Sequence, residues 1–221
     1  MTERIDRLRA GLVRACRELA QTGLVVGSAG NVSVRSDDLV LVTPTGARLA
    51  TLREDGLALV DLDGSLIDGP LLPTSELPLH LAVYRSFDAR AVVHTHPPMA
   101  TAVACVADEL PCIHYTLLSL GGSVRVAPYA TFGTAELADT VVEALQGRTA
   151  ALMAGHGAVT YGADVDAAIA ATELLEWACG VYVHACACGT PRVLDEQERL
   201  AVAEALATYG DAARVVSAHL P

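Results

Sequence analysis

The sequence predicts an α/β fold in which helices cover a mixed or mainly antiparallel sheet. Segments with helical spacing of apolar residues alternate with β-branched segments of strand character, and several strands are joined by turns short enough for hairpins. The composition is 52% hydrophobic but only 4% aromatic, so we expect a core of small side chains and closely packed helices. The 221 residues could form one large domain or two small ones; nothing in them looks like a linker, and we expect a single domain over residues 1–221.

The first half of the chain predicts a helix followed by paired strands. Apolar residues at helical spacing begin at Ile5, and Gly23 provides a stop. A turn at Asp37 and Asp38 joins the first two strands, and a turn at Asp63 and Gly64 joins the next two. The predicted elements are a helix over 5–19, strands within 27–35 and 39–46, and a strand pair over 58–69.

The second half predicts helices separated by short strands. Residues 75–87 form a helix that tolerates Pro78 in its first turn and takes Thr74 or Ser75 as its N-cap. The other predicted elements are a strand over 91–95, a short helix over 99–105, a strand and loop over 127–134, a helix over 134–146, two strands within 150–162, and helices over 165–187 and 196–209.

Charge and cysteine usage narrow the functional class. The formal net charge of −11 argues against nucleic acid or an anionic membrane as a partner. No segment has the roughly 18 consecutive apolar residues of a membrane span, and the N-terminus is a charged amphipathic helix rather than a signal peptide. The six scattered cysteines lack a disulfide-framework spacing, so we expect reduced thiols and a cytoplasmic protein.

His94 and His96 raise the first question about chemistry. Residues two apart on a strand point to the same face, so the two imidazoles can take two positions around a tetrahedral zinc ion, at about 2.0–2.1 Å from it. An isolated pair of this kind is more often simply hydrogen-bonded. His156, in a turn between Gly155 and Gly157, adds a third imidazole, and three protein ligands with one open position are typical of a catalytic metal.

Glu76 and three short loops complete the candidate site. Near the start of its helix, Glu76 is either a favourable charge at a helix N-terminus, a fourth metal ligand or a general base. The loops 27–33, 43–46 and 73–76 are rich in glycine and hydroxyls, and could bind an anion through amides and a helix N-terminus. Each loop alone is more often an ordinary turn.

The chain contains no lysine, which excludes Schiff-base chemistry and a Walker-type phosphate lysine.

A second candidate metal set lies near the end of the predicted helix 165–187. His184, Cys186 and Cys188 are spaced by two residues, which on a helix spreads the side chains around the axis. We therefore expect these residues to be packing residues rather than metal ligands.

Seven motifs, in this order, resemble those of the class II aldolase/adducin family: GSAGNVSVR, LVTPTG, PTSELPLHLAVY, AVVHTHPP, IHY, APYATFGT and GHG. The resemblance extends from the first helix to ATYG near the C-terminus. It implies a three-layer α/β/α fold with a central, mainly antiparallel sheet. It also implies a four-fold symmetric homotetramer with its active site at the subunit interface.

The resemblance assigns roles to individual residues. The implied zinc ligands are His94, His96 and His156, with Glu76 as the acid/base that can also bind the resting metal. The implied phosphate site consists of Gly30, Asn31, Thr45, Gly46, Thr74 and Ser75. Tyr115 and Tyr209 match two tyrosines near the aldehyde, and the first acts across the subunit interface in the family. The chain departs from the family pattern at Gly155, where Asn or His is usual, and at Thr74, where Ser is commoner.

The implied reaction is reversible cleavage of a ketose 1-phosphate, such as L-fuculose 1-phosphate, into dihydroxyacetone phosphate and a small aldehyde. Without lysine, the enediolate has to be stabilised by zinc or another divalent metal. The same fold also serves pentulose-phosphate 4-epimerases, which tend to have Asp at the position of Glu76, and methylthioribulose-1-phosphate dehydratases. Adducin-type members are interaction modules without the ligand set, so the intact set favours an enzyme.

Overall fold

The computed structural model describes residues 2–217, except for the side chains of residues 2, 207 and 209–217. The helices are α1 (Thr2–Gln21), α2 (Leu77–Ser86), α3 (Pro98–Ala104), α4 (Ala135–Ala144), α5 (Val165–Cys188) and α6 (Glu196–Ser217), with 3₁₀ turns η1 (Leu49–Thr51), η2 (Glu54–Gly56) and η3 (Tyr115–Leu120). The strands are β1 (Asn31–Ser36), β2 (Leu39–Val42), β3 (Ala58–Asp61), β4 (Leu66–Asp68), β5 (Ala91–Thr95), β6 (Glu109–Leu110), β7 (Val124–Ala127), β8 (Ala150–Met153) and β9 (Gly157–Gly162).

The strands of residues 2–217 form one nine-stranded sheet in the order β4-β3-β2-β1-β5-β9-β8-β7-β6. Neighbouring strands run antiparallel except for β7 and β8, which are parallel. The prediction of a mixed, mainly antiparallel sheet is therefore confirmed. The order also places β1 next to β5, so that Asn31 pairs with His94 although the two are far apart in sequence.

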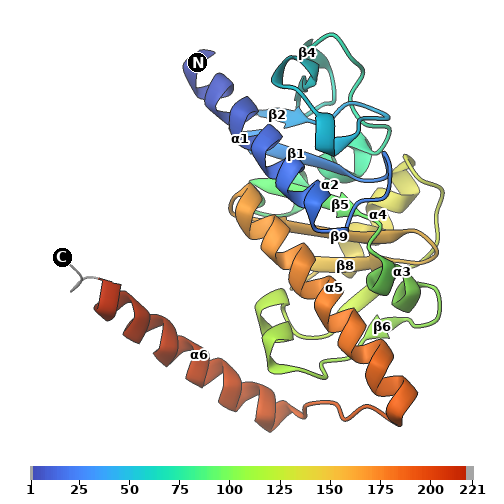
Figure 1. The fold of residues 1–221 in the computed structure, drawn as a ribbon, viewed down its shortest axis with the longest axis vertical. Helices are drawn as coiled ribbons and strands as arrows, with labels where there is room; N and C mark the ends of the chain where they lie inside the picture. Colours follow the sequence, from blue (N-terminus) through green and yellow to red (C-terminus); the bar gives the residue numbers. More distant parts are fainter. Residues whose placement is uncertain (1, 218–221) are drawn as a thin grey trace.

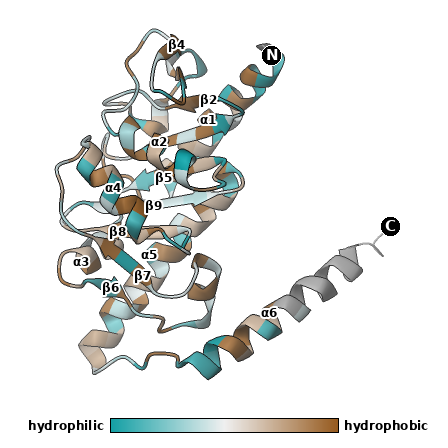
Figure 2. Ribbon diagram, turned by 180° about the vertical axis from the view of Figure 1, so that it is seen from behind, coloured by the Kyte–Doolittle hydropathy of each residue, from teal (hydrophilic) through white to brown (hydrophobic). Residues whose placement is uncertain are grey.

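Helices cover both faces of the sheet and give the three-layer α/β/α arrangement that the resemblance implies (Figure 1). Side chains alternate along β5: Val92 packs with α2 and α4, whereas Ala91 and Val93 pack with α1. Helices α3 and α5 cover the same face as α1, over β8 and β9. The turned view of Figure 2 shows α2 and α4 on the opposite side of the sheet from α1 and α5.

Several local expectations need correction. Helix α2 begins at Leu77 and its N-cap is Glu76, not Thr74 or Ser75, because the Thr74 hydroxyl accepts the amide of Glu76 in a tight turn before the helix. The strand expected within 127–134 lies earlier and ends at Ala127, and β6 and η3 were not predicted. The prediction that His184, Cys186 and Cys188 are packing residues is wrong, since all three are exposed on the end of α5.

The C-terminal helix α6 extends away from the sheet and its covering helices, and its beginning lies near η3 (Figure 1). Tyr209 lies on α6, and its side chain is outside the described residues. Among residues 2–217, no helix combines the length and the apolarity that crossing a bilayer requires.

Candidate active site

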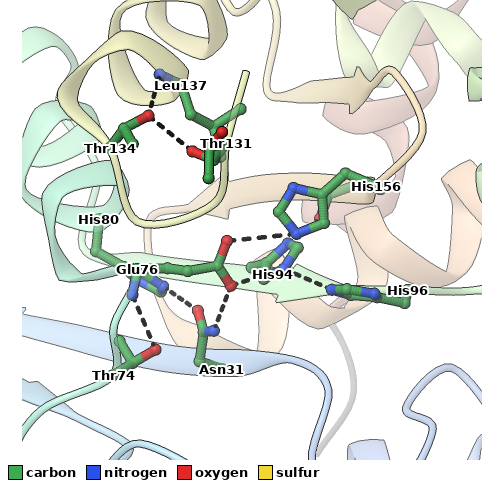
Figure 3. Close-up of polar contacts among 11 residues, drawn as sticks. Asn31, Thr74, Glu76, His80, His94, His96, Thr131, Thr134, Leu137 and His156 are labelled. Atoms are coloured by element: carbon green, nitrogen blue, oxygen red, sulfur yellow. Dashed lines mark hydrogen bonds and ion pairs between the residues drawn. The ribbon is translucent and has the colours of Figure 1, made fainter. Parts of the chain in front are cut away.

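Three histidine rings meet at the end of β5. His94 is on the strand, His96 follows its last residue, and His156 lies in the turn between β8 and β9. The ring centroids are 4.7, 4.9 and 4.9 Å apart, which makes a nearly equilateral triangle (Figure 3). Gly157 permits this approach, because a Cβ there would lie 2.4 Å from the Thr95 carbonyl oxygen.

One ring nitrogen of His94 is hydrogen-bonded to the backbone, and the other faces the site. Its Nδ1 donates to the carbonyl oxygen of Ala158 at 2.9 Å on the adjacent strand β9. The second nitrogen, Nε2, therefore faces the other rings, and His96 Nε2 lies only 2.9 Å away. With a proton it donates to Glu76, and without one its lone pair can bind a metal ion. A backbone acceptor on the remote ring nitrogen is how proteins usually orient a metal-ligating histidine.

Glu76 faces this triangle from the start of α2. Its Oε2 lies 3.0 Å from His94 Nε2, and its Oε1 lies 3.4 Å from His156 Nε2. Oε1 is buried and has no hydrogen-bond partner, whereas Oε2 also accepts from the Asn31 amide at 2.9 Å (Figure 3). Burial acts to raise the pKa of Glu76, but the hydrogen bond and charge of His94 and the Asn31 amide outweigh it and lower that pKa to about 2.

These four residues fit a divalent metal ion. Glu76, His94, His96 and His156 each offer one donor atom, and all four atoms lie within 4.8 Å of one another. Donors placed tetrahedrally at about 2.0–2.1 Å from zinc are about 3.3 Å apart. The orphaned Oε1 of Glu76 also needs a partner that the protein does not supply. Burial, together with the charge of His94, lowers the pKa of His96 to about 4 and also that of His156, so both rings stay neutral as ligands must.

Three members of this cluster, Glu76, His96 and His156, line one side of a cavity of about 280 Å³. The three loops singled out in the sequence meet there, and the six residues proposed for phosphate all line it: Gly30, Asn31, Thr45, Gly46, Thr74 and Ser75. Among the described residues that line the cavity, none is Lys or Arg. The loops hold one another: the amide of Thr74 donates to the carbonyl of Thr43, and the amide of Thr45 to that of Leu72. An anion here would depend on amides and hydroxyls.

Sequence reasoning missed two groups of residues at the site. Tyr129 and Phe132 are exposed aromatics on the loop between β7 and α4, and both line the cavity. The signal was that the chain has only two phenylalanines and places one of them in this loop. Tyr115 does not line the cavity of its own chain. It is exposed at the start of η3, with its ring 4.6 Å from that of His114.

The second missed group lies beneath Glu76. His80 and Tyr84 on α2 and Ser33 on β1 are buried and hydrogen-bonded to one another, and His80 also contacts Asn31. The available signal was the spacing Glu76, His80, Tyr84, since residues four apart share one side of a helix.

The fold and this set of donors match known proteins. The family model described as Class II Aldolase and Adducin N-terminal domain matches residues 10–183. A 5-methylthioribulose-1-phosphate/5-deoxyribulose-1-phosphate aldolase of Rhodospirillum rubrum is 39% identical over 212 residues, covering 95% of this chain and 96% of the relative. The L-fuculose phosphate aldolase of Escherichia coli strain K12 is 38% identical over 208 residues, covering 93% of this chain and 96% of the relative.

A solved structure supports the same conclusion. That of an L-fuculose 1-phosphate aldolase matches with a TM-score of 0.86 at 34% identity, covering 90% of this chain and 95% of the other. The chain therefore belongs to the class II aldolase and adducin family, and it is an enzyme of the aldolase type, a lyase that breaks carbon–carbon bonds.

Proposed function

We propose that the enzyme reversibly cleaves a ketose 1-phosphate into dihydroxyacetone phosphate and a small aldehyde, with zinc as its metal. One observation carries the proposal: a carboxylate and three imidazoles converge at one side of a cavity that is also lined by three loops rich in glycine and hydroxyls. The first group suits a catalytic divalent metal and the second a phosphate. In this shared cavity the phosphorylated end of a sugar would lie beside the metal.

His94, His96 and His156 would hold the zinc ion, and Glu76 would be its fourth ligand before substrate arrives. When bound, the ion polarises the substrate carbonyl and stabilises the negative charge that develops on its oxygen. Three neutral histidines accept several divalent ions, so another metal could supply the same chemistry.

The protein's own groups account for anchoring and proton transfer. The loops at Gly30, Thr45 and Ser75 anchor the phosphate and thereby fix the C3–C4 bond relative to Glu76. Tyr115 of the partner subunit takes the proton of the C4 hydroxyl as that bond breaks. The electron pair of the bond moves toward C2. Glu76, which is ionised at rest, takes up a proton from solvent and delivers it to C3 to complete dihydroxyacetone phosphate, while Tyr115 releases the C4 proton to solvent. Tyr209 would line the aldehyde side.

Two features of the chain extend this proposal to the oligomeric state and the cellular location of the enzyme. Because Tyr115 lies outside the cavity of its own chain, the enzyme would work as a homotetramer in which neighbouring subunits complete each site. All six cysteines are free, which supports a reducing, cytoplasmic location.

The relatives suggest two kinds of substrate. The E. coli relative is named for L-fuculose phosphate, and the R. rubrum relative for 5-methylthioribulose 1-phosphate and 5-deoxyribulose 1-phosphate. All three are ketose 1-phosphates whose C3–C4 cleavage gives dihydroxyacetone phosphate, and they differ only in the aldehyde. We propose that this chain accepts one or more of them.

The test is to offer each of the three ketose phosphates to the purified protein and to measure dihydroxyacetone phosphate through a coupled dehydrogenase. We expect release that a chelator abolishes and that added zinc restores. Release that is insensitive to the chelator would reject the metal assignment. If the zinc-loaded protein released none but epimerised ribulose 5-phosphate or dehydrated methylthioribulose 1-phosphate, the aldolase proposal would be wrong.

A further inference from the structure

We propose that His80 is a positioning residue for the acid/base carboxylate: with Ser33 and Tyr84 it locks the Asn31 amide so that its NH₂ group points at Glu76. This inference rests on the role proposed for Glu76 above. It adds three residues that do not line the cavity: Ser33, His80 and Tyr84.

The four residues and Glu76 form a continuous buried chain of hydrogen bonds. Tyr84 Oη lies 2.7 Å from Ser33 Oγ, which lies 2.7 Å from His80 Nδ1. His80 Nε2 contacts Asn31 Oδ1, and Asn31 Nδ2 donates to Glu76 Oε2 at 2.9 Å (Figure 3). His80 and Ser33 are fully buried, and the other three residues are at most 6% exposed. Their polar groups therefore depend on one another rather than on water.

The fold explains how this chain forms. Glu76, His80 and Tyr84 are four residues apart and so occupy one side of the start and body of α2. Asn31 and Ser33 are two apart on β1 and point to the same face of the sheet, the face that α2 covers. Side chains four residues apart on α2 therefore form hydrogen bonds with side chains two residues apart on β1.

Only one direction of the hydrogen bonds satisfies every member. Burial lowers the pKa of His80 to about 3, so the ring is neutral, with one donor and one acceptor nitrogen. The ionised carboxylate of Glu76 can only accept, so Asn31 must turn its NH₂ toward Glu76 and its carbonyl toward His80. His80 then donates from Nε2 and accepts the Ser33 hydroxyl at Nδ1, and Tyr84 donates to Ser33.

A flipped Asn31 would be penalised at both ends. Its carbonyl oxygen would face the Glu76 carboxylate, and its NH₂ group would face the N–H of His80. A buried polar group without its partner is unfavourable, because it has given up its hydrogen bonds to water without a replacement. The ring of His80 therefore holds the amide in the orientation that steadies the Glu76 carboxylate.

Two substitutions of one residue separate this role from mere packing. In His80→Gln the side-chain amide can replace Nε2 and still donate to Asn31, whereas in His80→Asn the shorter amide reaches only Ser33. Each variant loses one contact of the same kind, so packing alone predicts equal effects. Outer-shell positioning residues typically contribute 10–100-fold to activity. We expect kcat of His80→Asn to fall by about that factor and kcat of His80→Gln to stay within about 3-fold.

The matched control is Thr172→Val. Thr172 belongs to another buried hydroxyl pair, 2.7 Å from Thr160, which does not reach the cavity. This variant should lose stability without losing kcat. Equal kcat in His80→Asn and His80→Gln would overturn the proposal, as would a Thr172→Val variant that loses activity as much as His80→Asn does.

A second measurement asks whether His80 acts through Asn31. In an Asn31→Ala background the His80→Asn change should lower kcat by less than about 2-fold, because residues acting in one chain are not additive. Effects that simply multiply would overturn the proposal. An activity-independent readout is the ¹⁵N spectrum of metal-free protein, in which His80 should be the Nε2–H tautomer, and an Nδ1–H tautomer would contradict the chain. Absence of aldolase activity in the zinc-loaded wild type would instead reject the proposed function.

Discussion

Glu76 is a buried carboxylate that stays ionised without an arginine or lysine beside it. Burial alone would favour its protonated form, but His94 on one side and the Asn31 amide on the other favour the anion. The same two neighbours leave Oε1 free, directed at His156 and the cavity. One oxygen is thus held by the protein, and the other is available to a metal ion or to a substrate proton.

The first prediction concerns Glu76→Gln. The amide has nearly the size of the carboxylate but cannot exchange a proton at neutral pH, so kcat should fall by about 10²–10⁴-fold. His94, His96 and His156 remain, so bound metal should stay near one ion per chain, and elemental analysis of the dialysed variant checks this alongside kcat.

Glu143→Gln is the control for that variant, since Glu143 is exposed on α4 and does not line the cavity. It should keep wild-type turnover. If Glu76→Gln retained full kcat with its metal bound, Glu76 would not be the acid/base of the reaction.

Among the elements, strands and helices were predictable from periodicity because their side chains alternate at spacings of two or close to four residues. That rule also placed His94 and His96 on one face of β5. Short pieces such as η3 and the two-residue β6 carry too little periodic pattern to be recognised. The cap of α2 was misplaced because Thr74 bonds to the amide of Glu76 ahead of the helix instead of capping its first turn.

The spacing of residues in the sequence could not predict that the site residues come together. Their convergence depends on β1 lying beside β5 and on α2 lying across both, which is a matter of strand order rather than of local pattern. Motif resemblance supplied the missing long-range information for the six residues around the cavity. It did not indicate His80, which belongs to the packing between α2 and β1 rather than to the cavity.

The burial of His80 between α2 and β1 predicts how the stability of the protein depends on pH. The pKa of His80 is about 3 in the folded protein, mainly because of burial, and about 6.5 in the unfolded chain. Between these values the unfolded state binds the extra proton, so the stability contributed by the neutral ring is present above pH 6.5 and is lost on acidification. The loss amounts to about 2 kcal/mol by pH 5.

The variant His80→Gln has no imidazole at this position and therefore lacks this contribution to the pH dependence of stability. Urea unfolding of the metal-free proteins at pH 7 and pH 5 should therefore show the free energy of unfolding shifting by about 2 kcal/mol in favour of the variant at the lower pH. Identical pH dependence of wild type and variant would mean that His80 is not held neutral in the fold.

For the whole molecule, one chain supplies the proposed metal ligands and phosphate loops, and exposed aromatic residues stand beside its cavity. Tyr129 and Phe132 line the cavity, while Tyr115 and Trp177 are exposed elsewhere on the same chain, and the ring of His114 contacts both. A single subunit thus presents an incomplete site and, separately, an exposed tyrosine. The homotetramer proposed above would bring the two together, because a cyclic assembly places one surface of each subunit against a different surface of the next.

That arrangement predicts complementation between two inactive variants. Glu76→Gln tetramers lack the acid/base and Tyr115→Phe tetramers lack the hydroxyl, so each alone should have little activity. In mixed tetramers made by co-expression, a site that takes Glu76 from one subunit and Tyr115 from its neighbour is intact, and random mixing gives about a quarter of the sites this composition. The measurement is kcat per site of doubly tagged tetramers. Recovery of about a quarter of wild-type activity would show that Tyr115 acts across the interface. No recovery in verified mixed tetramers would mean that Tyr115 either serves the active site of its own subunit or takes no part in the reaction.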